Sequence, residues 1–161
     1  MVQCLYKNER CNFVLLLGNF QYTLDDKNRI RLPAKYREKL GNEYILMPGI
    51  DGCIFLYPAD AEEKFLRAVE EMEFDSEKSE IVSRIAELSS TVEADNQGRF
   101  MLTPDLLKFA KIDKEVRIRG WFKRIEIWSE ELYVQRHEEK AQSPEVMNQA
   151  YTEFHKAVNK K

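Results

Sequence analysis

Two motifs with the same spacing carry the residues best suited to chemistry in this chain. Arg29 follows Asp25 by four residues, and Arg99 follows Asp95 by four residues. An aspartate at a turn can accept hydrogen bonds from nearby backbone amides, and a following arginine can pair with its carboxylate. Asp25 and Asp26 could instead act as paired carboxylates in acid–base catalysis. We favour the turn role, because aspartate is frequent at turns for this structural reason.

The rest of the sequence does not complete a catalytic or metal site. It contains no glycine-rich phosphate loop, and its two histidines, His137 and His155, are expected on exposed helix surfaces. Cys4, Cys11 and Cys53 lack the close Cys-x-x-Cys pairing of zinc and redox sites, so reduced structural thiols are expected. We therefore predict that the chain is not an enzyme and uses no metal and no cofactor.

Charge is unevenly distributed along the sequence. The stretch from Asp25 to Lys39 has six cations and three anions, a net charge of +3, although the whole chain has a formal net charge of −3. The stretch from Pro58 to Ser90 has four cations and ten acids, a net charge of −6. Because nucleic-acid affinity depends largely on neutralised phosphates, the basic stretch favours a DNA partner, although a solvated surface is the ordinary alternative. The candidate DNA-contacting residues are Lys27, Arg29, Arg31, Lys35 and Arg37.

An internal repeat sets the expected architecture. Residues 24–33 align with residues 94–103 at an offset of 70, and residues 52–58 align with residues 123–129 at an offset of 71. Agreement of a turn, a strand and a helix start in the same order rarely arises by chance. We predict an N-terminal extension at 1–13, a first repeat at 14–60, a helical connector at 61–90, a second repeat at 91–133 and a C-terminal helical tail at 134–161.

Each repeat should begin with a tight turn that leads into a short strand. Asn28 and Gly98 occupy equivalent turn positions, and both residue types tolerate a positive φ. In the strand that follows, period-two alternation places Ile30 and Leu32 on the core face. The same alternation places two arginines, Arg29 and Arg31, on the opposite face.

The remaining elements are predicted from turn residues and apolar periodicity. Pro33 at the first helical position and Gly41 after the last should bracket a helix at 34–40. Strands at 44–47 and 54–57 should form one hairpin, and strands at 116–119 and 125–128 should form another around Gly120. A last helix starts at Ser143-Pro144, and its apolar stripe could pack on its own chain or on a neighbouring subunit. That stripe consists of Met147, Tyr151, Phe154 and Val158.

The doubled Asp-x-x-x-Arg motif, with Leu17-Gly18 upstream and Ile125-Glu126-Ile127-Trp128 at the end, resembles the MraZ family. The match covers roughly residues 14–140. The resemblance implies an α+β, mainly β fold: an AbrB-type swapped-hairpin β-barrel made of two tandem repeats, with peripheral helices. Asp25 and Arg29 fill the first motif of the family, and Asp95 and Arg99 fill the second.

The same resemblance implies a function. Family members form ring-shaped homo-oligomers, associate with the nucleoid and repress the division and cell-wall gene cluster that contains their own gene. They act on double-stranded DNA at direct repeats upstream of the promoter. We therefore expect a cytoplasmic, nucleoid-associated repressor with no membrane association, and the longest apolar run, Phe13–Leu17, is too short for a bilayer span. The alternative is a protein-interaction scaffold built on the same barrel, which the net acidity favours.

Three features depart from the family pattern. Asn28 stands where the first motif usually has glycine, and Met101 stands where the first repeat has Arg31. Because its neighbours in sequence are more basic, we expect Arg29 to matter more for DNA binding than Arg99; alternatively, both arginines only tie each turn to its own aspartate. Residues 1–13 precede the point where the family's chains begin, so we expect translation to start at Val14 or Leu15.

Overall fold

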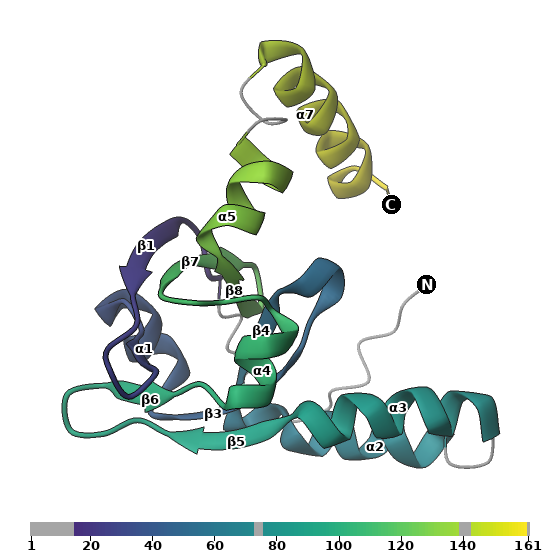
Figure 1. Ribbon diagram of the computed structural model, residues 1–161. Helices are drawn as coiled ribbons and strands as arrows, with labels where there is room; N and C mark the ends of the chain where they lie inside the picture. The colour runs from purple at the N-terminus through teal and green to yellow at the C-terminus, as the bar shows by residue number, and fades with distance from the viewer. Residues whose placement is uncertain (1–14, 73–75, 139–142, 161) are drawn as a thin grey trace.

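The computed structural model describes residues 15–72, 76–138 and 143–160 of the 161-residue chain. The predicted extension at 1–13 and the predicted start at Val14 lie outside the described residues. Figure 1 shows a sheet-rich body from which a helical hairpin and a C-terminal helix project.

The first repeat contains two short strands, a helix and a hairpin. Its elements are β1 (Asn19–Thr23), β2 (Arg29–Arg31), α1 (Ala34–Leu40), β3 (Glu43–Pro48) and β4 (Ile54–Pro58), with the 3₁₀ turn η1 (Ile50–Gly52) between the last two strands. Helix α1 has the predicted bounds, although Pro33 caps it from outside instead of occupying its first position. Gly41 ends α1 with a φ of 77°, a conformation that glycine adopts without strain.

The second repeat follows the same order. Its elements are β5 (Ser90–Glu93), β6 (Arg99–Met101), α4 (Pro104–Phe109), β7 (Glu115–Trp121) and β8 (Arg124–Ser129). Helix α4 begins after Thr103, whose side chain accepts a hydrogen bond from the Leu106 amide. The hairpin turn lies at Phe122-Lys123, so its predicted placement at Gly120 was wrong. Gly120 lies inside β7, where a Cβ would come within 2.6 Å of the Leu16 carbonyl carbon.

Helices join and follow the two repeats. The connector consists of the 3₁₀ turn η2 (Ala59–Ala61), α2 (Glu62–Met72) and α3 (Ser76–Leu88). After β8 come α5 (Glu130–Tyr133), the π-helical turn η3 (Val134–Glu138) and α7 (Pro144–Val158), which Ser143 caps through the Val146 amide. None of the described helices is both long and apolar enough to cross a membrane.

The two repeats exchange strands with each other. The six-stranded antiparallel sheet has the order β1-β7-β8-β4-β3-β5. Strand β1 of the first repeat pairs with β7 of the second, and β5 of the second pairs with β3 of the first. Strands β4 and β8 join the two repeats at the centre of the sheet. The fold is therefore mixed α and β, mostly antiparallel sheet, and is built from two interlocked repeats.

The expected closed barrel is not found among the described residues. Strands β1 and β5 are the two edges of the large sheet, and they do not pair with each other. The short strands β2 and β6 pair only with one another, as a separate two-stranded ribbon. The ribbon lies over the large sheet without joining its hydrogen-bonded ladder, which leaves the sheet open.

The main core lies between the six-stranded sheet and the layer formed by the ribbon with α1 and α4. The predicted alternation in β2 is confirmed, because Ile30 and Leu32 are buried and Arg31 is exposed. The opposite face of the sheet has a smaller apolar cluster, which α5 helps to cover. This second cluster consists of Cys53, Phe55, Trp128 and Tyr133.

Candidate nucleic-acid interface

The Asp25 carboxylate organises the first repeated turn. Its Oδ1 atom accepts hydrogen bonds from the amides of Lys27 and Arg29, each at 2.9 Å. Its Oδ2 atom accepts a hydrogen bond from Arg29 Nε at 2.7 Å. The Asn28 amide donates to the Asp25 carbonyl at 3.0 Å, and Asn28 has a φ of 55°. The aspartate thus serves the turn and holds the arginine, as the turn interpretation predicted.

The second turn repeats this geometry. Asp95 Oδ1 accepts from the amides of Gln97 and Arg99 at 2.9 Å, and Oδ2 accepts from Arg99 Nε at 2.9 Å. Gly98 has a φ of 75° and donates to the Asp95 carbonyl at 2.8 Å. The predicted positive φ at the two equivalent turn positions is therefore confirmed.

Hydrogen bonding keeps both motif aspartates in their charged form. The Arg29 amide is the main cause that lowers the pKa of Asp25 below its usual value of 3.8, and the Arg29 side chain acts in the same direction. The Arg99 amide and side chain lower the pKa of Asp95 in the same way. A carboxylate that accepts several hydrogen bonds is stabilised as the anion. Neither aspartate is therefore suited to donate or accept a proton near neutral pH.

The β2–β6 ribbon places the two motifs side by side. Ile30 pairs with Phe100 at its centre, Arg29 lies opposite Met101, and Arg31 lies opposite Arg99. Since Ile30 and Phe100 both face the core, the four flanking side chains share the outer face. Arg29 also comes within 3.9 Å of Asp95, so the ion pairs of the two turns touch.

This pairing weakens one reason for expecting Arg29 to matter more than Arg99 in DNA binding. The ranking assumed that Arg99 has no cation on its own face, because Met101 is its neighbour along the strand. Across the ribbon, however, Arg99 faces Arg31. The two repeats therefore contribute side chains to one shared ribbon face.

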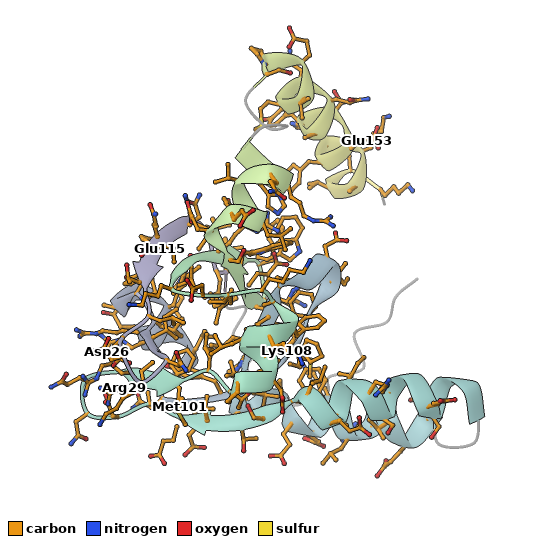
Figure 2. All side chains as sticks on the ribbon, in the orientation of Figure 1. Asp26, Arg29, Met101, Lys108, Glu115 and Glu153 are labelled. Carbon is orange, nitrogen blue, oxygen red and sulfur yellow. The ribbon has the colours of Figure 1, made fainter. Side chains whose placement is uncertain are left out.

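Two cations of the ribbon and its first turn are exposed and make no ion pair or side-chain hydrogen bond with a described residue. They are Lys27, in the first turn, and Arg31, in β2; both side chains are exposed. Arg29 and Arg99, in contrast, are partly buried and bound to their aspartates. Figure 2 shows Asp26, Arg29 and Met101 together at one corner of the molecule, where the ribbon faces outward.

Arg37 reaches the turn of the other repeat. It lies in α1 of the first repeat, and its guanidinium packs against Gly98 of the second. A Cβ at Gly98 would lie 2.5 Å from Arg37 Nη1 and 2.8 Å from its Cδ. The absence of a side chain at Gly98 therefore makes room for a cation beside the Asp95–Arg99 pair.

Lys35 is not brought to the ribbon. Its Nζ atom donates to the Leu17 carbonyl at 2.9 Å and lies 4.5 Å from the centre of the Phe20 ring. The structure thus gathers four of the five candidate DNA-contacting residues around the two turns: Lys27, Arg29, Arg31 and Arg37. The fifth, Lys35, points toward the segment before β1.

Comparison with known proteins identifies the family of this double motif. The family model described as "MraZ protein, putative antitoxin-like" matches the chain twice, at residues 15–85 and 88–155. The chain belongs to the MraZ family. Its MraZ relatives include the protein named "Transcriptional regulator MraZ" of Syntrophomonas wolfei, which is 36% identical over 130 residues, or 80% of this chain and 90% of the relative.

Other MraZ relatives show a similar extent of likeness. The "Transcriptional regulator MraZ" of Carboxydothermus hydrogenoformans is 34% identical over 120 residues, which is 74% of this chain and 84% of the relative. The protein of the same name from Clostridium acetobutylicum is 34% identical over 125 residues, which is 77% of this chain and 88% of the relative. The likeness extends over both repeats, so the resemblance noted in the sequence is confirmed.

A buried charge network on the far face of the MraZ sheet was missed in the sequence. Glu126 is 3% exposed, and its carboxylate accepts hydrogen bonds from Arg119, Arg124 and the Trp128 indole. Arg119 and Glu126 face each other across the β7–β8 hairpin. Had the turn been placed at Phe122-Lys123, the antiparallel register of the hairpin would have predicted that Arg119 lies opposite Glu126. With all its oxygens bonded, the carboxylate is a structural group that joins β7 to β8.

His137 belongs to the same network, so its expected surface placement was wrong. Its ring lies 4.9 Å from the rings of Trp128 and Tyr133, and Nδ1 lies 3.4 Å from Arg119 Nη1. Because a guanidinium only donates, this contact favours Nδ1 as the acceptor. Burial, followed by the charge of Arg119, lowers the pKa of His137. His155 is exposed on α7, as expected.

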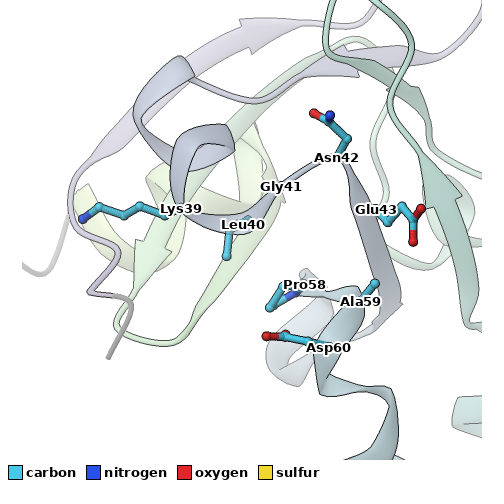
Figure 3. Close-up of a pocket in the computed structure, with 8 residues that line it drawn as sticks. All are labelled: Lys39, Leu40, Gly41, Asn42, Glu43, Pro58, Ala59 and Asp60. Atoms are coloured by element: carbon cyan, nitrogen blue, oxygen red, sulfur yellow. The ribbon is translucent and has the colours of Figure 1, made fainter. Parts of the chain in front are cut away.

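Apart from the ribbon and the Glu126 network, the described residues of the MraZ chain include a pocket and a buried thiol. A pocket of about 410 Å³ lies between the start of β3 and the end of β4, and its lining shares no residue with the ribbon (Figure 3). Burial raises the pKa of the Cys53 thiol to about 12, which fits a structural thiol. No group of three or more His, Cys, Asp or Glu side chains that could hold a metal ion occurs among the described residues.

Proposed function

We propose that this chain is a sequence-specific DNA-binding transcriptional repressor whose β2–β6 ribbon is the recognition surface. The observation that carries the proposal is the register of the ribbon, which sets Arg31 opposite Arg99 on one exposed face. Lys27 and Arg37 lie around this pair, at the first and second turns. The cations of both repeats thus meet on one small surface.

The shape of this surface suits duplex DNA. The major groove admits a two-stranded β-ribbon, and an arginine fork can bond the two acceptor atoms on the edge of a guanine. Arg31 is the best candidate for such a contact, because its guanidinium is exposed and bound to no other described side chain. Lys27 and Arg37 are placed to bind the flanking phosphates, which fix position and add affinity.

The two aspartates support this role by holding their arginines in place. Arg29 bonds Asp25 through Nε, and Arg99 bonds Asp95 through Nε and Nη2, so each aspartate fixes the direction of its guanidinium. A side chain fixed in this way loses less entropy when it binds. Lys35 then acts indirectly, since it anchors the segment before β1.

Membership of the family extends the proposal to a genetic role. The relatives are named transcriptional regulators. We infer that this chain acts in the cytoplasm, on nucleoid DNA, at direct repeats upstream of the division and cell-wall gene cluster that includes its own gene. A ring-shaped homo-oligomer would present several ribbons to successive repeats, so that weak contacts combine through effective concentration.

Selection of binding sites from random duplex DNA, followed by fluorescence anisotropy, tests the proposal. We expect an enriched motif, and we expect affinity for it to fall steeply as salt rises, because phosphate contacts release counterions. Arg31→Ala should weaken this binding. Arg84→Ala is a matched control, because Arg84 is an exposed arginine of α3 whose ion pair is with Glu87. Absence of any enriched motif, or equal effects of the two substitutions, would contradict the proposal and favour a protein-interaction scaffold.

A further inference from the structure

His137 lies where the C-terminal part of the chain packs on the sheet. It belongs to η3, the turn that follows α5, and its ring contacts the rings of Tyr133 on α5 and Trp128 on β8. The Trp128 and His137 rings meet edge to face, with an angle of 86° between their planes. In Figure 1, α5 rises from the sheet and α7 lies beyond it. The segment that leads to α7 is therefore held on the sheet by an aromatic cluster that contains an imidazole.

The two ring nitrogens of His137 have different surroundings. Nδ1 lies 3.4 Å from Arg119 Nη1, which can only donate a hydrogen bond. Nε2 is buried and has no hydrogen-bond partner among the described residues. A neutral imidazole can accept at Nδ1, whereas a protonated imidazole has a donor at both nitrogens. Protonation would therefore turn the contact with Arg119 into a contact between two donors.

The charges around the cluster also oppose a protonated His137. Arg119 of β7 and Arg136 of η3 are the cations that act on the ring, and Glu126 of β8 and Asp51 of η1 are the anions. Ion pairs already occupy the carboxylates that the structure places around this cluster: Glu126 with Arg119 and Arg124, Asp51 with Arg136, and Glu130 of α5 with Arg117. A protonated ring would thus be an additional cation beside carboxylates that are already paired.

Folding therefore favours the neutral ring. Burial, followed by the charge of Arg119, lowers the pKa of His137 below its usual value of 6.5. Between the two pKa values the unfolded segment binds a proton that the packed segment does not bind. The contribution of this packing to stability is therefore complete above pH 6.5, and it falls as pH drops toward the lower folded pKa.

We propose that His137 is a pH-sensitive latch, in which protonation of the ring releases η3 from Trp128 and Tyr133 while the sheet stays folded. This inference is independent of the proposed DNA binding. The other tie of η3 is the ion pair of Arg136 with Asp51, whose side chains are 44% and 54% exposed, and exposed pairs add little stability. The main core lies on the opposite face of the sheet and contains no part of η3. Acid should therefore release the segment that leads to α7 and leave the β2–β6 ribbon in place.

Proton NMR of the full chain measures the titration of the ring directly. His137 and His155 are the only histidines, and His155 is exposed on α7, so His155→Gln assigns the two imidazole signals and is the matched control. We expect the His137 signal to titrate below pH 6.5 and the Trp128 and Tyr133 ring signals to shift with the same midpoint. A His137 midpoint at or above 6.5, or neighbouring rings that do not respond, would overturn the inference.

Hydrogen exchange measured by mass spectrometry tests the release. After correction for the intrinsic effect of pH, amides of residues 134–138 should exchange several-fold faster at pH 5 than at pH 7, whereas β7 and β8 stay protected. His137→Gln offers Arg119 an acceptor that does not titrate, so this pH response should disappear, and His155→Gln should retain it. If circular dichroism shows that His137→Gln is unfolded, His137→Phe, which keeps an aromatic ring there, takes its place. An equal response in the natural chain and the His137 variant would show that the latch does not exist.

Discussion

The two repeated turns have the same hydrogen bonds but different surroundings. The first has Asn28 at its positive-φ position, and the second has Gly98. Arg37 of α1 packs on Gly98, whereas the position equivalent to Arg37 in α4 is the buried Leu107. The first repeat therefore donates a cation to the second turn and receives none in return. The comparison shows that charge segregated in the sequence becomes shared when the repeats interlock.

The largest expected effect comes from Arg31, the exposed arginine of the ribbon that makes no ion pair with a described residue. Arg31→Ala should weaken DNA affinity by about 1–3 kcal/mol per contact, on the order of tenfold to a hundredfold. Fluorescence anisotropy with the selected site measures this loss. Because Arg31 makes no ion pair with a described residue, the melting temperature should stay unchanged. Met101→Ala, at the equivalent position of the other repeat, should change DNA affinity less than about threefold. A larger effect would mean that Met101 itself contacts the DNA.

Exchange of the turn residues tests the difference between the two turns. Gly98→Asn keeps a residue that tolerates positive φ but forces its side chain into Arg37, so unfolding free energy should fall by about 1–3 kcal/mol. Arg37→Leu gives this position the residue type of its equivalent, Leu107. In the Arg37→Leu background, Gly98→Asn should lower the unfolding free energy much less. Urea denaturation of the four proteins in this cycle measures the coupling. If the two substitutions change the unfolding free energy additively, the lack of a side chain at Gly98 is not needed to accommodate Arg37.

The shared part of the two turns should respond to pH. Both aspartates have a lowered pKa in the folded chain, so their contribution to stability is present above the usual aspartate pKa of 3.8 and is lost as pH falls through the lower folded value. Asp25→Ala and Asp95→Ala should each lower the melting temperature at pH 7 and have much less effect at pH 3. Thermal denaturation at the two pH values checks this. A deficit that is equal at both would exclude the charged carboxylates as its cause.

The smallest expected effect is the difference between the two motif arginines. Arg29→Ala and Arg99→Ala should weaken DNA binding by similar amounts, within about threefold of each other. The reason is that each is bound to its own aspartate on the same ribbon face. Anisotropy and melting curves, measured side by side, check this. A much larger loss for Arg29 would restore the view that the first repeat dominates.

Much of the local structure followed from residue order. The offset of 70 predicted two equivalent turns, and the residue types of Asn28 and Gly98 predicted their positive φ. Alternation around Ile30 predicted which strand face is buried, and Pro33 and Gly41 predicted the bounds of α1. These features depend on contacts between near neighbours in the chain, which is why sequence spacing determines them.

Only the tertiary structure decided how the two repeats combine. That β2 pairs with β6, so that Arg31 faces Arg99, depends on contacts between residues about 70 positions apart. The place of Arg37 on Gly98 and the burial of Glu126 depend on the same long-range packing. Spacing along the chain shows which face of a strand is polar, but it does not show which distant strand lies beside it. The sequence therefore predicted the motif, but it did not predict the surface that the two copies of the motif form together.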